Sequence, residues 1–156
     1  MSRTVQTEVY KFNELSKPAK KKALQWGEDL NTAYNWWENI EEDAKIVGVL
    51  FDDFSIYSGT IKGSFDSNAY ESCQRILLTH GCKTETFKNA LYYKEFLDKD
   101  EENEFVSSVF LNKILKDYFN LLRREFEYLT SEAAIIEAIE ANDYEFYLDG
   151  SIFIQK

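Results

Sequence analysis

The hydrophobic positions of this chain are densest between Glu101 and Leu129, a segment that contains neither glycine nor proline. Apolar residues recur there at spacings of three and four, which places them on one face of a helix. The stripe consists of Leu111, Leu115, Tyr118, Leu122, Phe126 and Leu129, and is widened by Val106, Phe110, Ile114 and Leu121. A helix of roughly 28 residues is about 40 Å long, which exceeds the core of a small domain. The pattern therefore predicts a long helix that neighbouring elements cover or that offers part of its face to a partner.

Shorter helical patterns occur on both sides of this segment. Ser16 is a typical N-cap and Pro18 suits a first turn, so a helix is predicted from about Ser16 to Trp26. Four more segments have one apolar side at helical spacing. They start at Asn31–Asn35, Asp66–Ser67, residue 84 and Thr130–Ser131, and they end at Gly48, His80–Gly81, residue 97 and Asn142. Asn142 is expected to end the last helix in a left-handed conformation.

Strand-forming segments occupy the remainder of the chain. Five short strands are predicted near residues 6–12, 49–57, 60–65, 143–148 and 151–155. Ser58-Gly59 and Asp149-Gly150 are turn dipeptides, and the second lies between alternating apolar residues, which is typical of a hairpin. We therefore predict one α+β domain over residues 1–156, in which the strands share a small, mostly antiparallel sheet.

The net charge of −10 is unevenly distributed. The chain is net positive up to Gly27 and strongly negative from Glu28 onward. This sign disfavours direct binding to nucleic acid and favours binding to a basic protein surface. Acidic residues from Glu95 to Glu104 and after Arg124 could form one face that imitates a phosphate track, although plain solvation is the simpler explanation. The acidic residues predicted to bind a partner are Glu101, Glu102, Glu104, Glu125, Glu127, Glu132, Glu137 and Glu140.

Trp36 and Trp37 are adjacent at the start of a predicted helix. Neighbouring helical side chains point about 100° apart, so one of the two rings could be accessible to a partner. A core role for one ring and partial exposure of the other is the simpler interpretation. Both residues are candidate partner contacts.

No catalytic, cofactor or metal site is predicted. The single histidine, His80, lies two helical turns from Cys73, which is too far for a direct hydrogen bond, and its spacing to Cys82 fits no zinc motif. The chain has no glycine-rich phosphate loop or nucleophile elbow. Adjacent acids such as Asp52 and Asp53 diverge, although a carboxylate enzyme using a divalent metal stays open as an alternative. The cysteines are interpreted as reduced thiols and no segment has a signal-peptide or membrane-spanning pattern, so we expect an intracellular protein.

The opening from Tyr10 to Ala23, Tyr-Lys-Phe-Asn-Glu-Leu-Ser-Lys-Pro-Ala-Lys-Lys-Lys-Ala, resembles a widespread group of small phage and prophage proteins. The resemblance continues through Trp36-Trp37, Asp43-Ala44-Lys45 and the closing segment from Ala141 to Phe146. Some members of that group are labelled antitoxin-like. The resemblance implies an origin and a fold, and it implies no catalytic residues.

These observations together favour a phage-encoded, non-enzymatic interaction protein in the cytoplasm of a bacterial host cell. The most concrete form is an inhibitor of a host defence system, similar to an anti-CRISPR, whose acidic face covers a basic nucleic-acid-binding surface. An antitoxin-like module that neutralises a partner toxin is an alternative. Self-association through the long helix is a further one.

Overall fold

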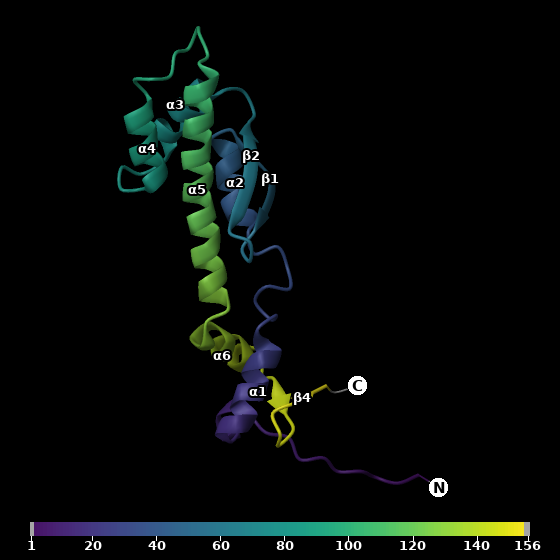
Figure 1. The fold of residues 1–156 in the computed structure, drawn as a ribbon. Coiled ribbons are helices and arrows are strands. Elements are labelled where there is room, and N and C mark those ends of the chain that lie inside the picture. The colour runs from purple at the N-terminus through teal and green to yellow at the C-terminus, as the bar shows by residue number, and fades with distance from the viewer. Residues whose placement is uncertain (1, 155–156) are drawn as a thin grey trace. The chain divides into compact units, whose positions relative to one another are not determined.

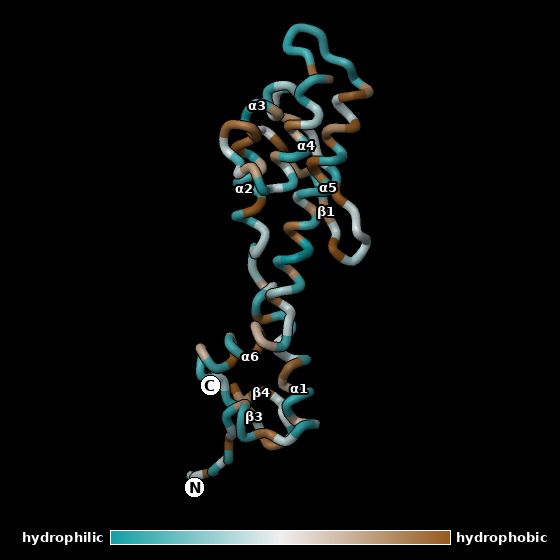
Figure 2. Tube along the Cα trace, turned by 90° about the vertical axis from the view of Figure 1, so that its left-hand side faces the viewer, coloured by the Kyte–Doolittle hydropathy of each residue, from teal (hydrophilic) through white to brown (hydrophobic). Residues whose placement is uncertain are grey.

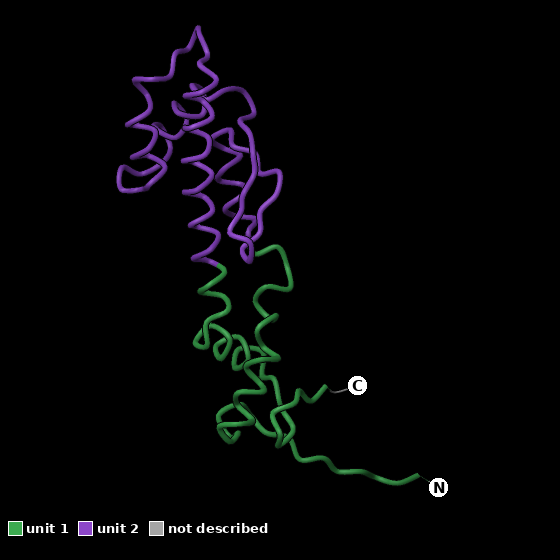
Figure 3. The backbone as a smooth tube through the Cα atoms, viewed as in Figure 1, with its two compact units in different colours: residues 1–36, 126–156 green, residues 37–125 purple. Residues whose placement is uncertain are grey.

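The computed structural model describes residues 2–154, which form two compact units (Figure 3). Unit 1 comprises residues 1–36 and 126–156, and unit 2 comprises residues 37–125. In chain order the elements are η1 (Phe12–Glu14), α1 (Lys17–Gly27), α2 (Glu38–Ile46), β1 (Val49–Ser55), β2 (Thr60–Phe65), α3 (Ala69–Thr79), α4 (Glu85–Tyr93), α5 (Glu104–Leu129), α6 (Glu132–Ala141), β3 (Glu145–Phe146) and β4 (Ile152–Phe153). The predicted α+β class with a long helix is confirmed. The prediction of one domain over residues 1–156 stays a prediction.

In unit 2, α5 is covered by its neighbours. Figure 1 shows α3 and α4 on one side of it and α2 with the β1–β2 hairpin on the other. Phe110 on α5 stacks with Phe65 of β2 at 5.8 Å between ring centroids and contacts Tyr93 of α4 at 5.5 Å. The buried cluster around it contains Ala44, Val47, Val49, Ala69, Cys73, Ile76, Ala90, Ile114, Leu115 and Tyr118. The apolar stripe of the long helix is thus used for the core of this unit.

The β1–β2 hairpin has the predicted antiparallel pairing, from Val49 opposite Phe65 to Ser55 opposite Thr60. Gly59 in the turn has φ +69°, a conformation that glycine adopts without strain. Gly63 permits a close approach between the strands, because a Cβ there would lie 2.3 Å from the carbonyl oxygen of Leu50. The geometry of the hairpin therefore depends on Gly59 in its turn and on Gly63, which has no side chain, in β2.

Unit 1 has a second core, formed where α1 and α6 pack around Phe146. The predicted N-cap Ser16 accepts a hydrogen bond from the backbone N–H of Ala19, and Ser131 does the same for Ala134 in α6. The other buried members of this core are Phe12, Leu15, Ala19, Ala23, Ile135 and Ile139. Figure 2 shows the alternation of hydrophobic and hydrophilic residues along both helices. Both caps satisfy N–H groups that a helix start would otherwise leave unpaired.

Two strand predictions were wrong. Residues 6–12 form no strand, because only Tyr10 pairs, through two backbone hydrogen bonds of 2.8 Å with Phe146, before the chain turns into η1. The strands do not share a sheet either, since β1–β2 and β3–β4 form separate two-stranded sheets in different units. The closing strands are also shorter than predicted, and Gln155 of the last one lies outside the described residues.

Several helix ends differ from prediction as well. The second helix begins only at Glu38, and turns occupy the residues before it. Asn68 caps α3, with its side chain accepting from the N–H of Glu71, rather than Asp66 or Ser67. Asn142 has φ −98°, and Asp143 adopts the left-handed conformation at φ 53°. Asn68 and Asp143 lie one or two residues from the predicted positions, and α2 begins three or more residues after its predicted start, differences that periodicity alone does not resolve.

Candidate functional site

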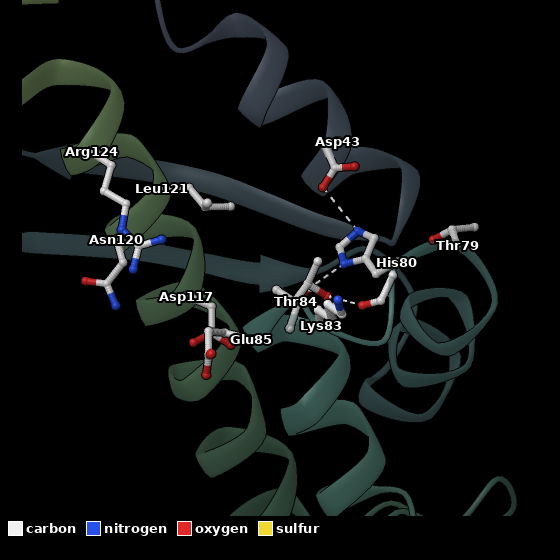
Figure 4. Close-up of a pocket in the computed structure, with 12 residues that line it drawn as sticks. Asp43, Thr79, His80, Lys83, Thr84, Glu85, Asp117, Asn120, Leu121 and Arg124 are labelled. Atoms are coloured by element: carbon white, nitrogen blue, oxygen red, sulfur yellow. Dashed lines mark hydrogen bonds and ion pairs between the residues drawn. The ribbon is translucent and has the colours of Figure 1, made fainter. Parts of the chain in front are cut away.

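A pocket of about 500 Å³ lies in unit 2, between α2, the α3–α4 connection and α5 (Figure 4). It is partly open to solvent, and ten of its twelve lining residues have polar or charged side chains. Its lining residues are Asp43, Thr79, His80, Gly81, Lys83, Thr84, Glu85, Thr86, Asp117, Asn120, Leu121 and Arg124. A volume of this size is typical of a small-molecule site.

His80 lines the pocket, and its side chain is only 10% exposed. As the C-cap of α3 it has extended backbone, which directs its ring towards Asp43. Its Nδ1 lies 2.5 Å from Oγ1 of Thr86, and its Nε2 lies 3.1 Å from Oδ2 of Asp43. The second contact has the distance of an ion pair but not the angles of a hydrogen bond, so the buried Nε2 has no hydrogen-bond partner among the described residues. The ring is thus held mainly through Nδ1.

Tyr118 supports the same carboxylate from α5. Its hydroxyl donates a hydrogen bond of 2.8 Å to Oδ2 of Asp43, and its ring lies edge-on to that of His80 at 6.4 Å. Burial raises the pKa of Tyr118 well above its usual value, and the negative charge of Asp43 raises it further. The phenol therefore stays protonated and remains a donor to Asp43.

The Thr86–His80–Asp43 arrangement superficially resembles a catalytic triad. In such a triad the hydroxyl oxygen must reach the substrate carbonyl. Thr86 lines the pocket but is only 4% exposed, so little of its side chain reaches solvent. The contacts of Thr86 and Asp43 with the two ring nitrogens orient His80 in the pocket wall.

Asp117 lies on α5 at the edge of the pocket. Its Oδ2 accepts a hydrogen bond of 2.6 Å from the side-chain amide of Asn89. Burial raises the pKa of Asp117, and the negative charge of Glu85 adds to this effect, while the bond from Asn89 opposes it. Its charge is thus stabilised by a neutral amide and by the nearby charges of Lys113 and Lys116, and it forms no ion pair with any described residue.

The acidic residues predicted to form one face divide into groups. Glu101 and Glu102 lie in the α4–α5 connection and Glu104 begins α5, and all three are exposed. Glu125 follows Glu104 by 21 residues of the same helix, a separation of about 30 Å. Within unit 2 the structure therefore groups the first three with their exposed neighbours, Glu95, Asp98 and Asp100, and leaves Glu125 apart.

The remaining predicted acids belong to unit 1. Glu127 lies in the last turn of α5, and α6 carries Glu132, Glu137 and Glu140, all exposed. Nearby acids in this unit are partly neutralised, because Asp143 lies 3.8 Å from Lys11 and Asp149 lies 3.2 Å from Lys22. The positive N-terminal segment thus offsets part of the acidic C-terminal one.

Two exposed aromatic rings stand beside the acidic residues of unit 2. Tyr92 is 64% exposed and Phe96 is 53% exposed, with their ring centroids 5.7 Å apart. Both fall within the helix predicted over residues 84–97, but α4 ends at Tyr93 and Phe96 follows it. We call residues 92–104 the aromatic–acidic connection. The proximity of Tyr92 and Phe96 to the acidic run was the sequence signal that could have identified it.

Trp36 and Trp37 are both partly buried, and their role as partner contacts stays a prediction. Trp36 packs on Phe126 at 5.6 Å within unit 1, and Trp37 lies edge-on to Phe54 at 5.9 Å within unit 2. The pair precedes α2 instead of lying on it, which lets each ring find its own aromatic neighbour.

Both cysteines are free thiols and form no disulfide bond. Cys73 is buried, donates to the carbonyl of Ala90, and has its pKa raised to about 11 by burial, so it is a thiol at neutral pH. Cys82 is an exposed free thiol. Across residues 2–154, no group of three or more His, Cys, Asp or Glu side chains is placed to hold a metal ion.

None of the helices in the described part of the chain has the length and apolar character needed to cross a membrane. Comparisons with protein-family models, with curated proteins and with solved structures gave no match. The functional argument therefore depends on the surfaces and the pocket of the chain itself.

Proposed function

We propose that this protein is a non-enzymatic binding protein that contacts a basic protein surface through the aromatic–acidic connection of unit 2. The observation that carries the proposal is the exposed ring pair of Tyr92 and Phe96 beside a run of acidic residues. Large exposed aromatic side chains next to a charged rim are typical of binding interfaces.

The charge of the connection matches such a partner. Between residues 92 and 104 there are six acidic residues, all exposed, and two lysines, Lys94 and Lys99. The acids favour encounter with a positive surface, and the two rings supply apolar area that is removed from water on binding. The acidic residues thus contribute mostly to the association rate, and the rings mostly to the affinity.

We further propose that the partner is a bacterial protein that handles nucleic acid, and that this protein inhibits it by covering its basic surface. The resemblance of the opening segment to small phage proteins supports a role against a host defence system. The partner's nucleic acid would then compete with this protein for one surface.

The test is a pull-down from bacterial lysate with the tagged full chain, at low and at high salt, followed by mass spectrometry. The surface variant is Phe96→Ser with Glu101→Gln and Glu102→Gln. The matched control replaces two exposed acids of α6, Glu132→Gln and Glu137→Gln, and so removes the same charge elsewhere.

A protein that the wild type and the control retain, that salt weakens and that the surface variant loses would support the proposal. The retained protein should then lose its nucleic-acid binding when this protein is added in equimolar amount. Equal retention by the wild type and the surface variant would contradict it, as would a partner that still binds nucleic acid in the complex.

A further inference from the structure

The pocket of unit 2 has an acidic and a basic end along one helix. Asp117, Asn120, Leu121 and Arg124 recur on α5 at spacings of three and four, so they lie on one face, and all four line the pocket. Asp117 and Arg124 are seven positions apart, which corresponds to about 10 Å along the helix axis. Figure 4 shows the Arg124 side chain extending back towards Asn120, which shortens the gap between the two charges.

At the acidic end, two carboxylates face the same space. Figure 4 shows Asp117 of α5 beside Glu85 from the first turn of α4. Asp117 is partly buried and accepts its hydrogen bond from the neutral amide of Asn89. Glu85 pairs with Lys88 at 3.3 Å, and Lys88 does not line the pocket. A cation placed between the two carboxylates would relieve their mutual repulsion.

At the basic end, Arg124 forms no ion pair with any residue in the described part of the chain. Lys83 forms none there either, but Figure 4 shows it beside Thr84 and not beside Arg124. The third carboxylate of the pocket, that of Asp43, is occupied by the Tyr118 hydroxyl and the His80 ring. The guanidinium of Arg124 is therefore available to a ligand carboxylate, which it can bind through two parallel hydrogen bonds.

We propose that this pocket binds a small zwitterionic molecule, with its ammonium group against Asp117 and Glu85 and its carboxylate against Arg124. Leu121, which lies between the two ends and is 42% exposed, covers the aliphatic part of such a ligand. The site is distinct from the aromatic–acidic connection, and the inference does not depend on the proposed binding of a basic protein.

Three probes of equal chain length separate the contributions of the two charges. 6-Aminohexanoate carries both charges, hexylamine only the cation and hexanoate only the anion. Titration of the ¹⁵N-labelled full chain by NMR at constant ionic strength would measure each affinity. We expect 6-aminohexanoate to bind at least about tenfold more tightly than either other probe. Its shifts should concentrate in residues 79–86 and 117–124.

Two substitutions test which end of the pocket binds which charged group of the ligand. Asp117→Asn keeps an acceptor for Asn89 and should reduce the affinity for 6-aminohexanoate to that for hexanoate. Arg124→Gln should reduce it to that for hexylamine. The controls Asp52→Asn and Lys62→Gln make the same changes on exposed β1–β2 residues outside the pocket and should leave the affinity unchanged.

Circular dichroism establishes that each variant is folded. Equal binding of hexylamine and 6-aminohexanoate would overturn the proposal, because it would show that only the acidic end recognises a charge. Shifts outside the pocket, or no shift with any probe at millimolar concentration, would overturn it as well.

Discussion

Tyr118→Phe removes one oxygen atom from the centre of unit 2 and leaves the ring in place. The ring is fully buried, with Phe51 edge-on at 5.6 Å and His80 edge-on at 6.4 Å, and phenylalanine keeps both contacts. The hydroxyl has one described hydrogen bond, of 2.8 Å, to Oδ2 of Asp43. The substitution thus tests a single bond between α5 and α2.

The expected cost follows from the charge and exposure of the acceptor. A hydrogen bond to a charged group contributes roughly 1.5–3 kcal/mol to the free energy of unfolding. The Asp43 side chain is 50% exposed, so water can replace part of the lost bond. We therefore expect Tyr118→Phe to lower the free energy of unfolding by about 1–2 kcal/mol.

Urea unfolding followed by circular dichroism measures this change, provided that the m-value stays constant. Tyr93→Phe is the matched control, because Tyr93 packs on Phe110 in the same core and its hydroxyl bonds no residue in the described range. A double-mutant cycle with Asp43→Ala should give a coupling of about 1 kcal/mol or more. A cost equal to that of the control, or strict additivity in the cycle, would refute the reasoning.

Three further outcomes are expected. NMR titration of Asp149 should give a pKa of about 2, held low by hydrogen bonds from the Ser151 side chain and backbone, and Ser151→Ala should raise it towards 3.8. Because burial raises the folded-state pKa of Asp117 above its usual value of 3.8, the folded state binds more protons than the unfolded state between the two pKa values, and stability falls as pH rises through that window. Asp117→Asn should remove this fall, as urea midpoints at several pH values would reveal. Gly150 has φ +92°, and a Cβ there would lie 2.1 Å from the backbone oxygen of Ala19, so Gly150→Ala should lower the free energy of unfolding by at least about 2 kcal/mol. Gly59 has open space around it, so Gly59→Ala should lower the free energy of unfolding by only about 1 kcal/mol. Equal losses would show that the contact with Ala19 does not add to the cost.

The predictions from sequence were most accurate where the structure depends on neighbouring residues. The stripe of the long helix, the cap at Ser16 and the turn at Asp149-Gly150 all follow from spacing or from one residue's conformational preference, and all are present. The strand over residues 6–12 failed because its apolar residues alternate without a partner strand of matching length. Only Tyr10 finds backbone groups to pair with.

The candidate sites needed more than neighbouring residues. The exposed acids were predicted from composition, but their division between Glu104 and Glu125 depends on the length of α5. Tyr92 and Phe96 both fell within the helix predicted over residues 84–97, because periodicity does not reveal where α4 ends. No spacing rule connects His80 with Asp43, which is 37 residues earlier in the chain.

The sequence by itself therefore determined the helices, the hairpin turns and the acidic character, because these depend on interactions within a few residues. Tertiary structure alone decided which residues meet. Packing α2, the α3–α4 connection and α5 around one core brought Asp43, His80 and Tyr118 together and placed a pocket beside them. Such contacts depend on distances between elements far apart in the chain, and those distances are set only when the elements pack.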